Sequence, residues 1–249
     1  MHELIIRCDD FGLTQGTALG TLRALENHCI SSVGAIVNTG LRNDDAQALA
    51  CVPDITVGLH VNIVAGQPLS ELSEVPDLVD GNGCFFKSAR YRTSASDLID
   101  ARQVTCEIRA QVARFTELFG RRPAYLDSHS VFSPSFDRAL NQVAGEIGAV
   151  CVDSTFSALS ATCELNMVAM PNNMVGDSYD PLRFLLTDEG EVLQHERSFM
   201  VFHPAFLDAP LMKISTLREG RMQDQYALSS PELAHWLFEQ GVQLISIGK

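Results

Sequence analysis

Short apolar runs alternate with longer amphipathic runs along most of the chain. A short apolar run is typical of a buried strand, whereas apolar residues three and four positions apart are typical of a helix that packs one face on a sheet. The short runs predict strands at residues 4–8, 32–38, 56–63, 124–128, 149–153, 199–202 and 243–247. The amphipathic runs predict helices at residues 14–28, 43–51, 96–119, 134–147 and 231–240.

The clearest predicted helix spans residues 96–119. Ser96 is its expected N-cap, and Gly120 is the expected stop because glycine readily adopts the left-handed conformation that ends many helices. Between them, apolar residues recur at helical spacing and form one stripe: Ile108, Val112, Phe115 and Phe119.

Strands that alternate with helices predict a parallel sheet with crossover helices. The expected fold class is α/β: about seven such units suit a (β/α) TIM-like barrel of mostly parallel strands, complete or broken, better than a short open sheet. The pattern lapses between residues 64 and 95, where glycine and proline interrupt it, and an irregular stretch of this length is typical of a lid or a binding loop. A second unclear stretch covers residues 154–196. No repeat or linker divides the chain, so one domain over residues 1–249 is expected.

Composition narrows the classes of function. Of the 249 residues, 46% are hydrophobic, which excludes intrinsic disorder. The 31 acidic residues outnumber the 18 basic ones, so binding to nucleic acid or to an anionic membrane is not expected. No run approaches the roughly 20 apolar residues of a membrane span. The first ten residues lack the basic and apolar regions of a signal peptide, and a cytoplasmic location is expected.

Seven cysteines lie far apart in the sequence, without a CxxC pair. An odd number at wide spacing supports neither a disulfide framework nor a cysteine-type zinc site. Reduced thiols in a packed core are expected.

Candidate chemistry gathers where the predicted strands end. Asp9 and Asp10 follow the first strand, His60 lies in the third, and His129 and His203 follow two later strands. The carboxyl ends of parallel strands meet at one rim, so these side chains are expected to converge. Two imidazoles and one carboxylate form an incomplete coordination shell, which leaves room for water or substrate as a catalytic metal site requires.

Each of these residues also has a purely structural interpretation. Asp10 can cap a helix, His60 can be a hydrogen-bonded core histidine, and His129 can be a loop residue. His203 precedes a proline, which restricts it to extended backbone. Asp9 is harder to explain as a second cap, and burying both aspartates is costly without a cation.

Motifs of other enzyme classes are absent. The chain has neither a GxxxxGK[ST] phosphate-binding loop nor a GxGxxG loop after a strand, and no GxSxG nucleophile elbow. Ser128 lies between Asp127 and His129, but neighbours in a strand point to opposite faces, so they do not form a catalytic triad.

The polar strand ends also match a known family. The chain resembles the YdjC-like carbohydrate deacetylases, a family of chito-oligosaccharide (diacetylchitobiose) deacetylases. The resemblance implies a distorted (β/α) barrel with a catalytic divalent metal. The matching segments, in order, are residues 4–13 with DDFGL, 57–61 with GLH, 66–69, 80–85, 107–123, 125–129 with YLDSH, and 202–206 with FHPAF.

The resemblance assigns roles to these residues. Asp10, His60 and His129 are the expected metal ligands, Asp9 is the expected general base, and His203 is the expected general acid or substrate contact. The metal is expected to be Mg²⁺, with Zn²⁺ as the alternative. The implied reaction hydrolyses the N-acetyl group of a small acetylated amino sugar and releases acetate, and the class implies a homodimer.

One segment departs from the family. Members usually continue with a histidine-rich run such as DSHxHxH, whereas this chain has the sequence DSHSVFSP from Asp127 to Pro134. The ligand His129 is present, but the later histidines, which would shape the rim of the pocket, are missing. Two alternatives follow: a different metal-dependent amidase or esterase, or a catalytically silent carbohydrate-binding barrel. Asp9 separates the last of these from an enzyme, because a silent binder has no need of two adjacent carboxylates.

Overall fold

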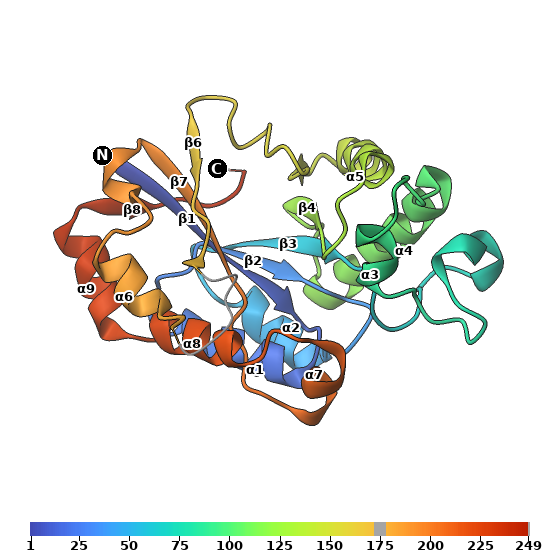
Figure 1. Cartoon of the computed structure of the whole chain (residues 1–249), viewed down its shortest axis with the longest axis horizontal. Coiled ribbons are helices and arrows are strands. Elements are labelled where there is room, and N and C mark those ends of the chain that lie inside the picture. The colour runs from blue at the N-terminus through green and yellow to red at the C-terminus, as the bar shows by residue number, and fades with distance from the viewer. Residues whose placement is uncertain (172–177, 249) are drawn as a thin grey trace.

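A curled sheet of parallel strands forms the centre of the molecule (Figure 1). The computed structural model describes residues 1–171 and 178–248. Within them the sheet has eight strands in the order β5-β4-β3-β2-β1-β7-β6, with β8 paired to β1. The strands are β1 (His2–Phe11), β2 (Ser32–Ala35), β3 (Thr56–Val61), β4 (Tyr125–Ser128), β5 (Val150–Cys151), β6 (Leu165–Met167), β7 (Arg197–Phe202) and β8 (Val242–Leu244).

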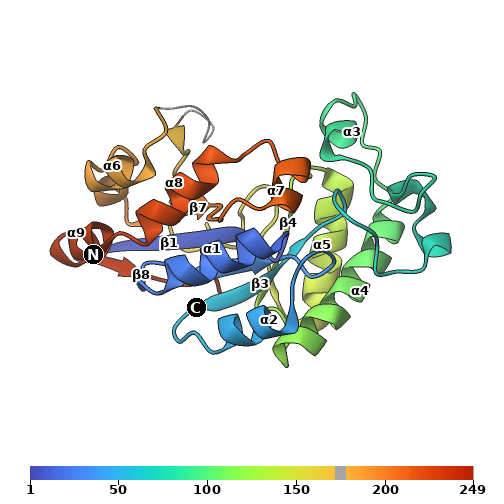
Figure 2. The ribbon, with the colours of Figure 1, turned by 90° about the horizontal axis from the view of Figure 1, so that it is seen from below.

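Helices cover the outside of this sheet as a continuous layer (Figure 2). Successive neighbours in the layer are α5, α4, α2, α1, α8, α6 and α9. The helices are α1 (Gln15–Leu25), α2 (Asn43–Ala50), α3 (Ser88–Arg92), α4 (Ala101–Phe119), α5 (Pro134–Ile147), α6 (Pro181–Leu186), α7 (Ala209–Ile214), α8 (Glu219–Leu228) and α9 (Pro231–Glu239).

The alternation of side chains along β1 explains both faces of the sheet. Leu4, Ile6 and Cys8 belong to the large core between sheet and helices. Ile5 points the other way and joins a smaller core inside the curl. Because successive strand residues face opposite sides, Arg7 and Asp9 follow Ile5 to the inside. The polar site is therefore built on the inner face.

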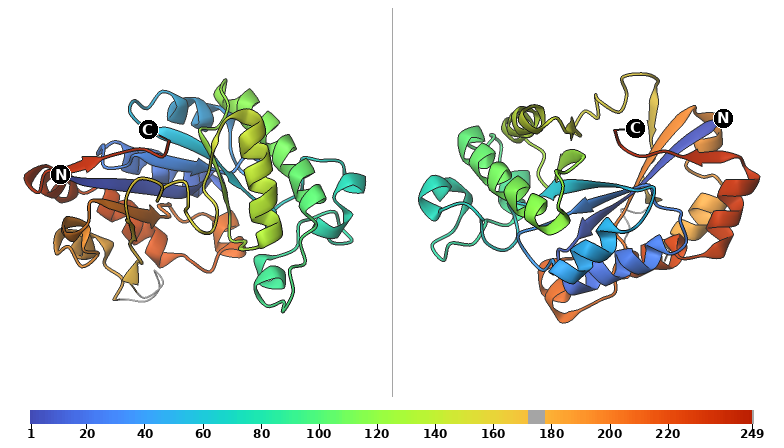
Figure 3. Two further views of the ribbon diagram at one scale, coloured as in Figure 1. Left: turned by 90° about the horizontal axis from the view of Figure 1, so that it is seen from above. Right: turned by 180° about the vertical axis from the view of Figure 1, so that it is seen from behind.

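The barrel is curled but open. Among the residues that the structure describes, no strand joins β5 to β6. Two strands share one edge of β1: β8 pairs with the beginning of β1, and β2 pairs with its end. The chain then crosses the amino ends of the strands, where Ser246 Oγ donates to Ser31 O and Ile247 N donates to Ser32 Oγ (Figure 3). The expected parallel α/β barrel architecture is confirmed.

Several predicted boundaries shift. The helix predicted at 96–119 begins at Ala101, and Asp100, not Ser96, is its N-cap. The turn before α4 binds the start of α5 instead. There the Asp97 carboxylate accepts hydrogen bonds from Ser133 Oγ and Ser135 N. The α5 helix itself spans the predicted residues.

The unclear stretches contain short elements that the sequence pattern did not predict. Residues 64–95 contain α3 and the 3-10 turns Leu72–Glu74 and Pro76–Leu78. Residues 154–196 contain β6, α6 and the turn Val192–Gln194, apart from residues 172–177, which lie outside the description. Helices α7 and α8 were likewise not predicted.

The cysteines follow the expectation only in part. All seven are free thiols, but only Cys8 and Cys29 are buried. Cys51 is exposed because it lies just past the end of α2. In the described part of the chain, no helix combines the length and the apolar character needed to cross a bilayer.

Candidate metal centre

A cavity of about 590 Å³ opens at the carboxyl ends of the strands, within the size range of small-molecule sites. All the candidate residues predicted from the sequence line it: Asp9, Asp10, His60, His129 and His203. The irregular segment 64–95 contributes Lys87 and Arg92 to the wall, as expected of a binding loop.

A bulge in β1 explains how two adjacent aspartates reach one cavity. The register between β1 and β2 shifts between Cys8 and Phe11, and Asp10 has a φ of 67°. Regular alternation would turn Asp10 towards the helices, but a bulge redirects a side chain, and aspartate tolerates this conformation better than most residues. Asp9 and Asp10 therefore both face the cavity.

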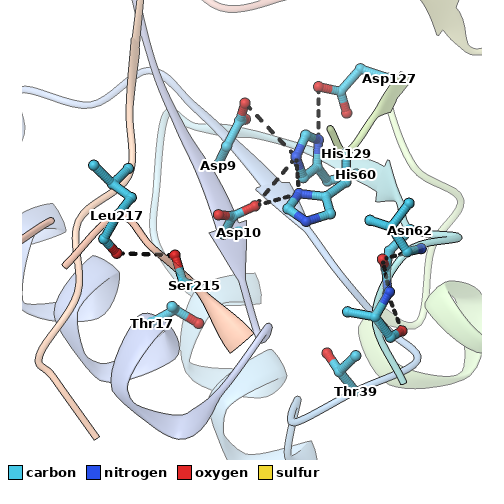
Figure 4. A network of polar contacts seen from close by, with 12 residues as sticks. Asp9, Asp10, Thr17, Thr39, His60, Asn62, Asp127, His129, Ser215 and Leu217 are labelled. Atoms are coloured by element: carbon cyan, nitrogen blue, oxygen red, sulfur yellow. Dashed lines mark hydrogen bonds and ion pairs between the residues drawn. The ribbon is translucent and has the colours of Figure 1, made fainter. Parts of the chain in front are cut away.

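Asp10, His60 and His129 meet closely (Figure 4). Asp10 Oδ1 lies 2.8 Å from His129 Nδ1 and 3.4 Å from His60 Nε2. The two imidazole nitrogens are 3.2 Å apart. One ligand atom from each of the three residues lies within 4.8 Å of the others, so the group could hold a metal ion.

A second layer of charged groups lies behind this trio. Arg7 binds Asp9 Oδ2 through Nη2 at 2.7 Å and Asp127 Oδ2 through Nη1 at 2.8 Å. Asp127 Oδ2 also lies 3.0 Å from His60 Nδ1. A carboxylate at Nδ1 orients the ring and fixes its tautomer, which leaves Nε2 for a metal or a substrate.

The sequence prediction assigned no role to Arg7 or Asp127. The sequence contains a signal for Arg7, whereas the signal for Asp127 depends on how the strands pair. Arg7 is a charged residue inside an apolar strand, two positions before Asp9 and therefore on the same face. Asp127 pairs with His60 in the register of β3 and β4. Only pairing of the strands reveals that second signal.

The pKa values of the two adjacent aspartates, Asp9 and Asp10, shift in opposite directions. Burial raises the pKa of Asp9 more than Arg7 and His60 lower it. Burial also acts on Asp10, but His129 and Arg221 outweigh it and hold the Asp10 pKa well below its usual value. Likewise, Asp127 and Asp9 outweigh burial and raise the pKa of His60. Asp10 is thus held ionised.

The donor set suits a divalent cation. The buried cluster contains three carboxylates, Asp9, Asp10 and Asp127, but only two arginines, Arg7 and Arg221. Asp9 Oδ1 and Asp127 Oδ1 are buried without a hydrogen-bond partner, which is costly unless a ligand or water completes them. Mixed oxygen and imidazole ligands fit several divalent metals, including Mg²⁺ and Zn²⁺.

His203 lines the same cavity and follows β7, the strand that pairs with β1. Its backbone N donates to Asp224 Oδ2 at 2.7 Å, and its ring atom Nδ1 is buried without a partner. Burial lowers the pKa of His203 to about 3, so the ring is neutral at pH 7 in the free protein. A neutral ring can hydrogen-bond to a substrate, and it becomes a proton donor only after it has gained a proton.

Parallel strands that bring carboxylates and imidazoles to one rim define an α/β protein with a hydrolase-type candidate metal site. The chain belongs to the YdjC-like protein family, whose family model matches residues 3–239. It is 31% identical over 252 residues to a chitooligosaccharide deacetylase of Enterobacter sp. (strain 638), covering 97% of this chain and 96% of that one. It is 29% identical to one of Proteus mirabilis, with 98% and 96% covered. The family resemblance is confirmed.

Solved structures agree on the fold. An Enterococcus faecalis protein named for cellobiose-phosphate cleavage superposes with a TM-score of 0.82 at 21% identity, covering 98% of this chain and 97% of that one. A CE4 esterase from Streptococcus mutans gives 0.56 at 12% identity, covering 98% and 85%. These two structures therefore share the fold of this chain.

Proposed function

We propose that this chain is a metal-dependent deacetylase that removes the N-acetyl group from a chito-oligosaccharide or a related sugar containing N-acetylglucosamine, and releases acetate. One observation carries the proposal: the Asp9 carboxylate, with an unpartnered oxygen, lies beside the trio of Asp10, His60 and His129. The relatives named as chitooligosaccharide deacetylases support the same reaction.

Asp10, His60 and His129 would hold the metal, which we propose to be Mg²⁺, with Zn²⁺ as the alternative. When bound, a divalent ion lowers the pKa of water and polarises a carbonyl group. Asp127 and Arg7 hold His60 and Asp9 in place. Three strands, β1, β3 and β4, supply these groups and bring them together.

Asp9 would act as the general base. Its oxygen Oδ2 lies 4.0 Å from His60 Nε2, so the carboxylate borders the proposed coordination site. From there Asp9 would accept the proton of the attacking water. His203 would hydrogen-bond to the acetamide, and the proton taken from the water by Asp9 would reach the leaving amine through His203.

The rim of the cavity suits a carbohydrate. Phe132 lines the cavity and is 76% exposed, in the segment that lacks the later histidines of the family. The loop that carries it is fixed, because His129 N donates to Val61 O at 2.9 Å and Val131 is buried. Aromatic side chains are frequent in ligand pockets, and Phe132 would pack against a sugar ring.

The test is acetate release from diacetylchitobiose. The protein is stripped of metal with a chelator and assayed alone, with Mg²⁺ and with Zn²⁺, beside His129→Ala and the control His235→Ala, whose side chain is exposed on α9. We expect activity only with metal, loss of that activity in His129→Ala, and none of that loss in His235→Ala. No acetate from a broad panel of acetylated sugars, together with no bound metal, would refute the proposal.

A second candidate is a different metal-dependent amidase or esterase, and the absence of the later histidines after His129 favours it. Metal binding without acetate release from any acetylated sugar would support this candidate. A barrel that binds sugars without metal would instead be a silent binder.

We further propose a cytoplasmic protein of one domain that acts as a homodimer. Cell fractionation, limited proteolysis and light scattering measure these three properties. Because the relatives match this chain over nearly its whole length, one catalytic domain is the simplest arrangement.

A further inference from the structure

Helix α8 sends two buried charged side chains into the centre of the molecule. Arg221 is 4% exposed and Asp224 is fully buried. Residues three apart on a helix share a face, and these two bind the ends of two neighbouring strands. Arg221 reaches Asp10 at the end of β1, and Asp224 reaches His203 after β7.

Arg221 determines which oxygen of Asp10 is available. Its Nη2 donates to Asp10 Oδ2 at 2.6 Å, and its Nε donates to Leu217 O at 3.1 Å, so the guanidinium is held from two sides. Asp10 Oδ1 is the oxygen that remains towards His129 and His60, at 2.8 and 3.4 Å. The carboxylate therefore presents a single oxygen to the two imidazoles.

Asp224 holds the segment that follows β7. Its Oδ2 accepts a hydrogen bond from the backbone N of His203 at 2.7 Å, while its Oδ1 accepts one from the Tyr179 hydroxyl. Two residues further along, Ala205 N donates to Arg221 O at 3.2 Å. The segment that carries His203 is thus tied to α8 at two points.

Building on the proposed function, we propose that Arg221 and Asp224 are positioning residues with separate tasks. Arg221 fixes the carboxylate of Asp10 so that Oδ1 alone faces the metal site. Asp224 fixes the backbone of His203, and therefore its ring, on the substrate side of the cavity. Helix α8 joins the metal-binding side of the reaction centre to its proton-transfer side.

The Arg221 task is tested by metal affinity. We expect Arg221→Gln to weaken Mg²⁺ or Zn²⁺ binding, measured by calorimetry, by roughly 10- to 100-fold, as is usual when a partner that orients a ligand is removed. Arg221→Lys keeps the charge but not the fork of the guanidinium, so it should fall between. The control Arg114→Gln removes an exposed arginine of α4. A metal Kd and a kcat of Arg221→Gln both within about threefold of wild type would overturn this assignment.

The Asp224 task is tested by a different readout. We expect Asp224→Ala to leave the metal Kd within about threefold of wild type and to lower kcat at least about tenfold, because only His203 moves. Asp224→Asn keeps an oxygen for the His203 N–H and should recover most of kcat. Asp44→Ala, which removes an exposed aspartate of α2, is the control and should leave kcat unchanged. An Asp224→Ala variant that matches Arg221→Gln in metal affinity, or that keeps full kcat, contradicts the assignment.

Crystal structures of the variants distinguish a failure of this inference from a failure of the proposed function. Circular dichroism identifies variants that do not fold, and Arg221→Lys and Asp224→Asn then carry the comparison. If wild type neither binds metal nor releases acetate, the proposed function fails, and crystal structures without metal decide the inference. A rotated Asp10 carboxylate in Arg221→Lys and a displaced His203 in Asp224→Asn or Asp224→Ala support it. Unchanged side chains in these variants overturn it.

Discussion

Two buried polar networks flank the end of β3, and they differ in one property. The candidate metal centre surrounds His60, whereas a second network begins two residues later at Asn62. We call this second network the Glu107 cluster; its members are Asn62, Leu69, Ser70, Glu107 and Gln111. Within the described part of the chain, several buried side-chain atoms of the metal centre lack a hydrogen-bond partner, while those of the Glu107 cluster are all bonded.

The bonding of the Glu107 cluster is complete. The fully buried Glu107 carboxylate accepts hydrogen bonds from Leu69 N, Ser70 N, Ser70 Oγ and Gln111 Nε2, at 2.8–3.1 Å. Gln111 in turn donates to Asn62 O at 2.7 Å and accepts from Asn62 N at 3.1 Å. The cluster pins the start of the irregular segment 64–95 to helix α4.

We interpret this difference as one between a structural scaffold and the candidate metal centre. A fully bonded buried network rigidifies the fold, whereas buried atoms without partners lower stability unless a ligand completes them. The candidate metal centre contains such unpartnered atoms beside His60, whereas the Glu107 cluster holds the same strand end in place. Substitutions in the first should therefore affect chemistry, and substitutions in the second should affect folding.

The largest expected effect is that of Asp9→Asn on catalysis. Loss of a general base typically lowers kcat by about 10²- to 10⁴-fold. Stability should change little, because burial raises the pKa of Asp9 and the ionised form is thus disfavoured in the folded state. Acetate release and thermal melting measure the two effects.

Asp44→Asn is the matched control, since Asp44 is an exposed aspartate of α2. If Asp9→Asn kept more than about a tenth of wild-type kcat, the base would have to be another residue.

The second prediction concerns Glu107→Ala. Removing the carboxylate takes an acceptor from Leu69 N, Ser70 N and the fully buried Gln111 Nε2, and a buried unsatisfied donor costs about 1–3 kcal/mol. We expect the free energy of unfolding, measured with urea, to fall by about 3 kcal/mol, and Glu107→Gln to lose less.

Glu117→Ala is the control on the same helix, because Glu117 is exposed, and it should change stability by less than about 0.5 kcal/mol. A Glu107→Ala protein as stable as wild type would remove the contrast between the two networks.

The third prediction adds a methyl group next to the metal centre. A Cβ at Gly34 on β2 would lie 2.9 Å from Asp9 Oδ1 and 3.2 Å from His60 Cβ. Overpacking of this kind costs about 1–3 kcal/mol, and displacement of Asp9 should lower kcat by about tenfold.

Gly145→Ala is the matched control, because nothing lies within 4 Å of the added Cβ on α5. It should be neutral or slightly stabilising. Equal kcat values for the Gly34→Ala and wild-type proteins would show that Asp9 has room to move without loss of function.

The sequence predicts the fold well where one face of an element is apolar. Helix α5 lies at the predicted residues, because Ser133, Pro134 and Gly148 mark its ends. Helix α8 has no such stripe: its buried residues include Arg221 and Asp224, which a hydrophobic pattern counts as surface. Because these charged residues are buried, a hydrophobic pattern does not predict α8. The same burial brings Arg221 and Asp224 into the site.

The sequence likewise predicts one part of the site and misses another. Asp9, Asp10, His60, His129 and His203 line one cavity, as their places at strand ends predicted, and their catalytic and metal-binding roles stay predictions. The oppositely charged partners of the centre depend on strand register and on helix packing, which spacing along one chain does not determine. The bulge that turns Asp10 inwards is equally invisible, because its φ of 67° is set by the pairing with β2.

The smallest expected effect is at an exposed ion pair, which gives the baseline for both buried networks. Arg109 on α4 binds Glu146 on α5 through Nε and Nη2, at 2.9 and 2.6 Å. Hydrogen bonds from Arg109 lower the pKa of Glu146 to about 2. A carboxyl group with a lowered folded-state pKa stabilises above its unfolded value of about 4.5, and that contribution is lost as pH falls towards 2.

Arg109→Gln should therefore melt slightly below wild type at neutral pH and converge with it in acid. Melting followed by circular dichroism between pH 7 and pH 2 measures this, with Arg114→Gln as the exposed control on α4. Exposed pairs contribute little, so the neutral-pH difference should be several-fold smaller than that of Glu107→Ala. A loss as large as that of Glu107→Ala would mean that charge pairing, and not burial with complete hydrogen bonding, holds this side of the barrel together.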